Sequence, residues 1–400
     1  MPLGLYISVP FCKSKCSYCN FASGVFPRAQ MQAYVDRLCR DLDEAEQLAR
    51  LAGGNFERAA DSLYLGGGTP SLLEPQQIKQ LFTAVRKNFV VQPDPEITVE
   101  CAPGTLSDAM LEALVAAGVN RVSLGVQSFV DEEARDVGRL HTSADARADV
   151  RTLRAAGIEN LNLDLIAGLP HQTKASWQKS LDEVTASEVQ HVSIYMLEVD
   201  EDSRLGRELL AGGSRYHAHF VPDEELTVEL YAEACERLNA AGLQQYEISN
   251  FARAAKESRH NLKYWTRRPY MGFGVDAHSM LHSSSPPYDA IRFAMPESLE
   301  EFSQRQNVGE RVRGTPVSER EAWEETFFLG LRLNCGVDLA AVGARFGAAM
   351  AQEAREIAAA LEDDGLVIVD HQKLRLTARG RLLSNEVFAR FIGEPTHAGK

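Results

Sequence analysis

The chain has 400 residues, of which 44% are hydrophobic and 24% charged, and its formal net charge is −14 at pH 7. A chain of this length and composition is globular and large enough for more than one domain. The acidic balance argues against nucleic acid as a partner, because phosphate binding depends on Lys and Arg. No apolar run approaches the roughly 20 residues of a membrane span, and no secretory signal precedes the first strand. We therefore expect a cytoplasmic protein without evident membrane association.

Six short β-branched runs alternate with helical stretches in the first half of the chain. Strands are predicted at 5–9, 62–65, 97–101, 121–127, 161–170 and 191–197, with helices around 28–50, from about 75, and between Ser107 and Gly118. This alternation predicts a parallel βα sheet. Polar residues follow nearly every strand, which favours an α/β fold built as a partial (β/α)6 barrel with its chemistry at the carboxyl ends of the strands.

The second half has a different pattern. The stretch 200–225 is charged and lacks a period, so we predict a loop or lid there. A helix is predicted at 224–240, a strand-like run at 244–252 and a turn at 283–287, and two short strands joined by residues 370–373 follow a helix near 351–364. The last part resembles a small α+β winged-helix-like domain, but its acidic balance favours a structural or partner-binding role. The predicted divisions are 1–225 (barrel), 226–315 (barrel extension) and 316–400 (C-terminal domain).

Three cysteines, Cys12, Cys16 and Cys19, follow the first strand with the spacing C-x3-C-x2-C. A [4Fe–4S] cluster normally takes four protein ligands, so three would leave one iron open for a small molecule. S-adenosylmethionine (SAM) can occupy such an iron through its amino and carboxylate groups. Three buried thiols or a zinc site are the alternatives, although no fourth Cys or His lies at zinc-finger spacing. The other cysteines, at 39, 101, 235 and 335, are expected to be buried or half-buried thiols in a reducing compartment.

Further candidates lie at the ends of the next strands. Gly66, Gly67, Gly68 and Thr69 follow the second strand, where glycine allows close approach to a ligand. Glu100 ends the third strand and could accept hydrogen bonds, Asp164 lies among apolar residues, and Arg139, twelve residues after Gln127, could bind a carboxylate. An ordinary turn, a solvated Glu and a surface Arg remain the alternatives.

The run HNLKYW places His260, Asn261, Tyr264 and Trp265 within one helical turn or a compact loop. An imidazole and two aromatic rings could bind a porphyrin through its iron and its macrocycle. The alternative is a His-Asn cap followed by two core aromatic residues.

The ordered motifs LYISVPFCKSKCSYCNF, LGGGTPSLL, ITVECAPG, NRVSLGVQSF, LDLIAGLP, YEISNFA and HNLKYW resemble those of radical SAM proteins related to oxygen-independent coproporphyrinogen III oxidase, and among them the heme chaperones of the HemW type. The resemblance implies a cluster on the three N-terminal cysteines, SAM and heme. It implies cofactor contacts from Tyr6, Tyr18, Gly67, Gly68, Thr69, Glu100, Gln127, Arg139 and Asp164, and heme contacts from His260, Asn261, Tyr264 and Trp265. The implied partners are heme and a heme-accepting protein; a homodimer is a further possibility.

Differences from the oxidases favour the chaperone. The oxidases carry an additional Cys where this chain has Phe21, and an N-terminal extension before the first strand. Two positions depart from the wider family, which usually has His in place of Ser8 and Gly in place of His171. We expect the protein to be able to cleave SAM. Coproporphyrinogen III dehydrogenation, another radical SAM modification of porphyrins, and transcriptional regulation through the C-terminal wing are the alternatives.

Overall fold

The computed structural model describes residues 1–305 and 312–393, and six of its parallel strands lie side by side in chain order. They are β1 (Leu3–Val9), β2 (Ala59–Gly67), β3 (Val90–Cys101), β4 (Arg121–Gln127), β5 (Asn160–Ala167) and β6 (His191–Met196). All six predicted strands are thus confirmed, although β3 begins at Val90 rather than near residue 97.

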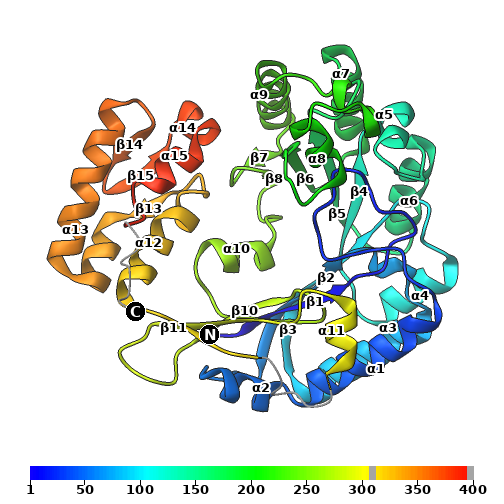
Figure 1. Cartoon of the computed structure of the whole chain (residues 1–400), viewed down its shortest axis with the longest axis horizontal. Coiled ribbons are helices and arrows are strands. Elements are labelled where there is room, and N and C mark those ends of the chain that lie inside the picture. Colours follow the sequence, from blue (N-terminus) through cyan, green and yellow to red (C-terminus); the bar gives the residue numbers. More distant parts are fainter. Residues whose placement is uncertain (306–311, 394–400) are drawn as a thin grey trace.

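Helices cover the outer face of this sheet (Figure 1). They are α1 (Ala29–Asp43), α2 (Ala45–Ala52), α3 (Pro75–Asn88), α4 (Asp108–Ala116), α5 (Asp131–Asp136), α6 (Ser143–Ala155), α7 (Lys174–Ser187) and α9 (Glu224–Ala240). Ser107 caps α4 as predicted, because its hydroxyl accepts from the amide of Met110 at 3.2 Å. The helix predicted over 28–50 is two helices, separated at Glu44.

The sheet curves without closing. Beyond β6 lies β8 (Asn250–Ala252), which pairs antiparallel with β6, and then β7 (Gln244–Gln245), which pairs antiparallel with β8. On the other side β9 (Tyr270–Phe273) pairs in parallel with β1 and is followed by β10 (His278–His282), β11 (Ala290–Ala294) and β12 (Thr315–Val317). The twelve-stranded sheet is therefore an open partial barrel, which confirms the predicted fold class.

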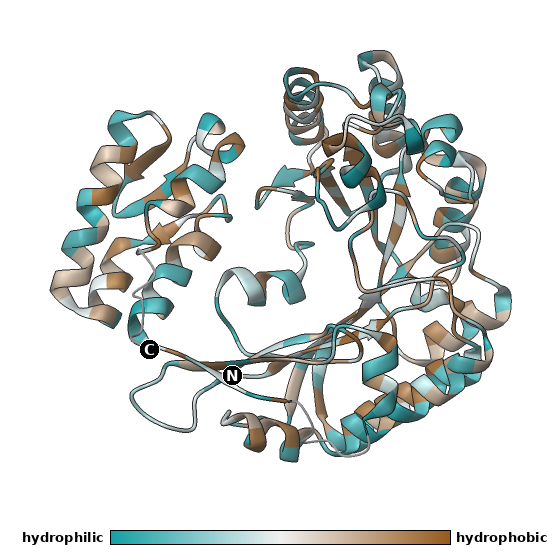
Figure 2. Ribbon diagram, viewed as in Figure 1, coloured by the Kyte–Doolittle hydropathy of each residue, from teal (hydrophilic) through white to brown (hydrophobic). Residues whose placement is uncertain are grey.

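Side chains alternate along β1–β6 between two faces. One face is apolar and packs under the helices; it includes Leu5, Ile7, Leu63, Leu65, Val99, Val122, Leu124, Leu163 and Ile194. The ribbon of the sheet accordingly carries both hydrophobic and hydrophilic residues (Figure 2). The other face is polar and lies on the concave side; it includes Tyr6, Ser62, Tyr64, Thr98, Glu100, Arg121, Ser123, Asn162, Asp164, His191 and Ser193. Because strand side chains alternate with period two, the helices bury one set and leave the other for ligands.

The stretch 200–225 contains regular structure, so the prediction of a loop was wrong, while that of a lid stays a prediction. It forms α8 (Arg204–Leu210), capped by the Ser203 hydroxyl, and the short 3-10 helix η2 (Arg215–Phe220). Backbone hydrogen bonds join it to the cysteine loop, because the amide of Leu205 donates to the carbonyl of Ser17 at 2.8 Å. The segment thus lies beside the cysteines.

The C-terminal part has its own hydrophobic core around Trp323 and Phe327. It contains α12 (Glu319–Gly330), β13 (Val337–Asp338), α13 (Leu339–Asp363), β14 (Val367–Asp370), β15 (Lys373–Leu376), α14 (Ala378–Leu382) and α15 (Ser384–Ala389). The helix predicted near 351–364 is longer and is interrupted at Gly347, whose φ is 87°. The antiparallel pair β14–β15 turns at His371 and Gln372, as the predicted wing requires.

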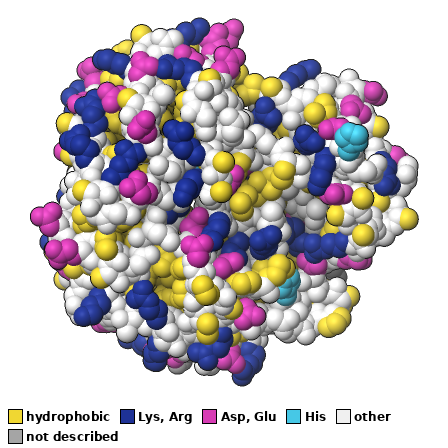
Figure 3. Space-filling view, turned by 180° about the vertical axis from the view of Figure 1, so that it is seen from behind, with side chains coloured by type: hydrophobic (Ala, Val, Ile, Leu, Met, Phe, Trp, Pro, Cys, Tyr) yellow, Lys and Arg dark blue, Asp and Glu magenta, His cyan; other side chains and the backbone are white. Residues whose placement is uncertain are grey.

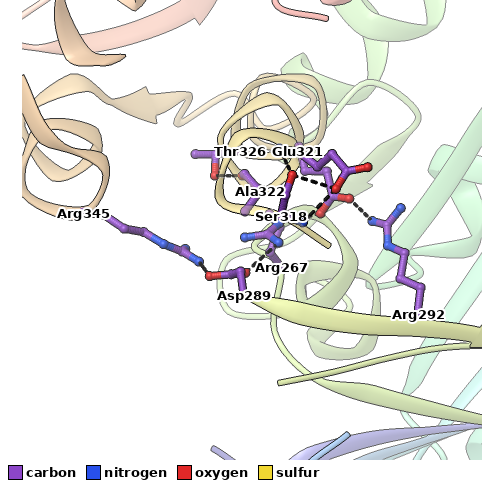
Figure 4. Close-up of polar contacts among 9 residues, drawn as sticks. Arg267, Asp289, Arg292, Ser318, Glu321, Ala322, Thr326 and Arg345 are labelled. Atoms are coloured by element: carbon purple, nitrogen blue, oxygen red, sulfur yellow. Dashed lines mark hydrogen bonds and ion pairs between the residues drawn. The ribbon is translucent and has the colours of Figure 1, made fainter. Parts of the chain in front are cut away.

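A network of ion pairs joins this domain to the barrel (Figure 4). The Arg267 side chain is 4% exposed and bonds both Asp289, at 2.9 Å, and Glu325 of α12, at 2.7 Å. Arg345 of α13 reaches Asp289 at 2.6 Å, and Arg292 reaches Glu325 at 2.9 Å. The short helices α10 (Arg259–Trp265) and α11 (Leu299–Gln304) complete the described chain.

The surface and the helix lengths bear on possible partners. On the face seen in Figure 3, basic side chains lie among acidic and hydrophobic ones. Within the parts of the chain that the structure describes, no helix combines the length and apolarity needed to cross a membrane.

Candidate functional site

The cysteine loop follows β1 at the carboxyl end of the parallel strands. Cys16 is buried and Cys12 and Cys19 are half-buried, and all three are free thiols. The amide of Cys12 donates to Gly24 at 2.9 Å, and the amide of Ser17 donates to Val137 at 3.0 Å. The loop is therefore held from both sides, and its thiols lie at the edge where parallel barrels carry their chemistry.

The thiols of Cys12, Cys16 and Cys19 form the candidate ligand set for a metal cluster. A zinc ion bonded to three thiolates at about 2.3 Å would bring their sulfurs to within about 4 Å of one another. Within residues 1–305 and 312–393, the three thiols do not form a set in which every pair of sulfurs lies within 4.8 Å. Burial raises the pKa of the Cys12 thiol, and neighbouring Cys19 and Cys16 add to the shift. The donor set fits a cubane cluster with one iron left open.

The glycine segment after β2 packs directly against this loop. The amides of Gly68 and Thr69 donate to the carbonyls of Val9 and Phe11, each at 2.8 Å. A Cβ added at Gly68 would lie 2.7 Å from the oxygen of Val9, so no larger residue fits. Because an ammonium group donates hydrogen bonds, this segment would bind one through its carbonyl oxygens. The hydroxyl of Thr69 lies 3.9 Å from the Cys12 sulfur.

Two predicted carboxyls lie on the polar inner face of the sheet. Glu100 accepts from the hydroxyl of Tyr64 at 2.8 Å and from the amide of Gly67 at 3.1 Å. Burial raises the pKa of Glu100 to about 7. Asp164 accepts from Ser123 at 2.9 Å and from Asn162 at 2.7 Å, and burial raises its pKa as well. Its hydrogen bonds are to neutral groups, and the nearby charge of Arg121 partly offsets the raised pKa of Asp164.

Arg139 lies next to the cysteine loop. Its guanidinium donates to the Cys16 sulfur at 3.5 Å and to the carbonyl of Gly125. Gln127 has a φ of 68° and lies on the same side of Gly125 as Arg139, because a Cβ added at Gly125 would be 3.0 Å from the Gln127 amide nitrogen and 3.1 Å from the Arg139 guanidinium. Tyr18 packs with a small apolar cluster that includes Val137 and Leu169, and burial raises its pKa.

A pocket opens between the cysteine loop and the segments that follow β3 and α5. It is lined by Lys13, Ser14, Cys16, Thr69, Leu72, Ala102, Pro103, Gly104, Thr105, Gly138, Arg139, Leu140, His141 and Asp145. Of these residues, only Cys16, Thr69 and Arg139 were predicted from the sequence. The run APGT (102–105) could have indicated four of the others, because it follows the end of a predicted strand in a predicted barrel.

Helix α10 carries the HNLKYW motif and lies on the concave side of the sheet (Figure 1). His260 is 1% exposed, and both of its ring nitrogens have partners: Ser62 at 3.0 Å and Tyr264 at 2.8 Å. Burial lowers the pKa of His260 to about 3, so the imidazole is neutral. Ser258 caps the helix, because its hydroxyl accepts from the Asn261 amide at 3.3 Å.

The motif side chains do not converge on one point. The imidazole ring of His260 lies 5.3 Å from the ring of Tyr64 and 6.5 Å from that of Tyr6. The guanidinium carbon of Arg332 instead lies over the ring of Trp265, 4.5 Å from the centre of that ring. His260 therefore adjoins the predicted SAM residues through Tyr64, which the sequence analysis missed, while Trp265 faces the C-terminal domain.

The remaining cysteines differ from expectation at one position. Cys101 is buried and Cys39 and Cys235 are half-buried, as predicted. Cys335 is exposed, so the prediction was wrong there. It follows α12 in a turn, where little of the chain can cover it.

Comparisons with known proteins agree with this architecture. The Radical SAM superfamily model matches residues 6–184, and the HemN C-terminal domain model matches residues 317–383. The heme chaperone HemW of Bacillus subtilis (strain 168) is 33% identical, covering 97% of this chain and 99% of the relative. The mitochondrial radical S-adenosyl methionine domain-containing protein 1 of Bos taurus is 34% identical, covering 94% and 84%.

Among solved structures, the coproporphyrinogen III oxidase HemN of Escherichia coli superposes with a TM-score of 0.81 at 26% identity, covering 98% of this chain and 90% of that one. The similarity to HemN thus extends over both domains, while the relatives named HemW match over nearly their whole length. The chain belongs to the HemW family of heme chaperones within the radical SAM superfamily.

Proposed function

We propose that this protein binds heme and passes it to an acceptor protein, with a [4Fe–4S] cluster and SAM supporting the transfer. The observation that carries the proposal is the full-length similarity to proteins named heme chaperone HemW. The family implies the cluster and SAM. The three free thiols beside Thr69 and Arg139 support that part of the proposal.

In this proposal Cys12, Cys16 and Cys19 hold three irons of the cluster. When bound, the reduced cluster and SAM supply a 5′-deoxyadenosyl radical. The carbonyls after β2 would accept hydrogen bonds from the amino group of SAM, and the Arg139 guanidinium would bind its carboxylate. Glu100 and Asp164 accept further hydrogen bonds on the inner face; Tyr6, Tyr18 and Gln127 complete the walls.

For heme, the proposed contacts are His260, Asn261, Tyr264 and Trp265. A neutral imidazole suits an iron ligand, and His260 is neutral. Its Nε2 is bonded to the Tyr264 hydroxyl at 2.8 Å, so iron ligation requires that this hydrogen bond be released. Heme loading on this motif therefore involves a rearrangement of α10 or of the Tyr264 side chain.

The C-terminal domain, proposed to span residues 316–400, is the proposed contact for the heme acceptor. Residues 1–225 and 226–315 would form the cofactor barrel and its extension. The main rival function is coproporphyrinogen III dehydrogenation, which the structural similarity to HemN favours. Phe21, where the oxidases carry an additional cysteine, is 65% exposed and supplies no thiol.

The heme proposal is tested by anaerobic heme titration of the cluster-loaded protein, followed by its Soret absorption. His260→Ala should weaken heme binding and shift the Soret band, while cluster absorption and SAM binding stay intact. Tyr264→Phe frees Nε2 of His260 and should preserve or strengthen heme binding. His278→Ala, at an exposed histidine, is the matched control. Unchanged Soret spectra in His260→Ala would remove His260 as the ligand, and absence of heme binding by the wild type would overturn the proposed function.

A further inference from the structure

Two histidines and an aspartate that the cofactor sites do not use lie together on the surface. Asp136 ends α5, His171 follows β5, and His217 lies in η2. Nε2 of His171 is 3.2 Å from Nδ1 of His217 and 3.6 Å from Oδ2 of Asp136. One ligand atom from each residue lies within 4.8 Å of the other two.

The separations of 3.2 and 3.6 Å are close to those in the first coordination sphere of a transition metal, and His217 approaches Asp136 through its other ring nitrogen, Nε2, at 4.0 Å. With metal–ligand bonds of about 2.0–2.2 Å, the ligand atoms of a tetrahedral zinc site lie roughly 3.3–3.5 Å apart. Two imidazoles and one carboxylate form a common ligand set for Zn²⁺ and for Fe²⁺. We propose that Asp136, His171 and His217 bind a divalent transition metal ion, with water completing its coordination.

The backbone holds the ligands in place before any metal arrives. His171 has a φ of 65° and His217 a φ of 60°, in the left-handed region that non-glycine residues seldom adopt. His171 also contacts η2 directly. Its amide donates to the carbonyl of Phe220 at 2.9 Å, and its ring lies 3.9 Å from the ring of Phe220. These contacts hold His171 beside the segment that carries His217.

The other surface His–Asp pairs offer a comparison. His278 lies 3.5 Å from Asp276, and His371 lies 3.5 Å from Asp370. Neither pair gains a third ligand: across the described ranges 1–305 and 312–393, Asp136, His171 and His217 are the only group of three. The site therefore differs from chance pairing of exposed charges.

The proposed metal would fasten η2 to the barrel next to the cysteine loop. The segment that carries His217 already contacts this loop, since Leu205 donates to Ser17 at 2.8 Å and Asn20 donates to Asp200 at 2.5 Å. A metal joining η2 to α5 and to the loop after β5 would cross-link three separate segments. The expected consequence is a metal-dependent ordering of residues 200–220 over the cysteine end of the barrel.

The test uses the full chain with its cluster assembled, so that the cysteines are occupied, and Zn²⁺ as the probe in anaerobic equilibrium dialysis. One zinc per chain should bind. His171→Ala, His217→Ala and Asp136→Asn should each weaken this binding at least about tenfold, since even outer-shell changes cost 10–100-fold. His219→Ala is the matched control, because it lies in η2 and stacks on Phe220 but is outside the group of three.

A second readout separates metal binding from folding. Zinc should protect residues 200–220 from trypsin in the wild type and in His219→Ala, and should fail to do so in His171→Ala. Cluster absorption should be the same in all of them. Zinc binding that is equal in all variants, or no zinc binding by the wild type, would overturn the proposal.

Discussion

Glu100 connects the electrostatics of the barrel interior with the proposed SAM site. It is bonded to Tyr64 and Gly67, and burial raises its pKa to about 7, so its charge changes near neutral pH. A cationic ligand favours the ionised form, because an opposite charge nearby lowers the pKa of a carboxyl. SAM affinity should therefore depend on the protonation of this residue.

The prediction is that SAM binds more tightly as the pH rises from 6 to 8. Glu100→Gln should bind SAM about tenfold or more weakly at pH 8, since a hydrogen bond to a charged group contributes about 1.5–3 kcal/mol, and its affinity should not vary through pH 7. Isothermal titration of the cluster-loaded protein measures both effects.

The effect of Glu100 on folding stability should change with pH in the opposite direction to its effect on SAM binding, and it serves as the control. A carboxyl whose folded pKa is raised loses stability as the pH rises through that range, because the folded state holds the proton more tightly. Glu100→Gln should thus be no less stable than the wild type at pH 8. A variant that is unfolded, or that keeps the wild-type pH dependence of SAM binding, would contradict the assignment.

The cysteines give a second prediction at this scale. Replacing any one of Cys12, Cys16 or Cys19 with Ala should abolish the broad visible absorption of the reconstituted cluster. Replacing Cys101 or the exposed Cys335 should leave it unchanged, because neither lies in the cysteine loop. A requirement for either of these two would contradict a cluster with an open iron.

Single residues also show the limits of the sequence. The structure places the glycines after β2 against the cysteine loop, which the sequence alone predicted as neighbouring candidates. The burial of His260 could not be predicted, because its partner Ser62 is 198 positions away in the chain. Arg121 and Thr98 on the inner face were missed for a similar reason: only the register of β3 and β4 places them opposite each other.

At the scale of elements, helix α10 depends on a carboxylate from β3. Glu96 is 5% exposed and accepts from the amides of Arg259 and His260, each at 2.9 Å. At the other end of the helix, Lys263 bonds Asp61 at 2.7 Å. A carboxylate at a helix N-terminus satisfies free amides and interacts favourably with the helix dipole.

Glu96→Ala should therefore lower the free energy of unfolding by about 3 kcal/mol, because buried amides lose a charged acceptor. Glu96→Gln keeps one acceptor oxygen and should lose less. Urea unfolding at pH 7.5 measures both. Two variants as stable as the wild type would show that α10 is held by its side chains alone.

Elements with a clear period were predictable, and the others were not. The six strands and α9 were found because their apolar residues recur regularly. Helix α8 has seven residues, too few to show a period, so the segment looked like a loop. Strands β9–β12 extend the sheet past β1, and no local pattern shows that the chain returns to that edge.

At the scale of the whole molecule, the C-terminal domain is held to the barrel by the ion pairs of Arg267. Arg267→Ala leaves the buried carboxylate of Glu325 with Arg292 as its remaining cation. Breaking such a buried pair costs about 3–5 kcal/mol, so urea should release this domain earlier. Arg345→Ala is the control: its side chain is 48% exposed, and an exposed pair contributes at most about 1 kcal/mol. Equal transitions for the two variants would contradict a buried junction.

The central claim is that the molecule as a whole handles heme without oxidising its precursor. The most direct measurement offers the cluster-loaded protein heme and coproporphyrinogen III in parallel anaerobic samples, each with SAM and reductant, and analyses heme absorption, SAM cleavage and porphyrin products. We predict saturable heme binding in the first sample and no protoporphyrinogen in the second. Formation of protoporphyrinogen without heme binding would contradict it and would make the protein a coproporphyrinogen dehydrogenase.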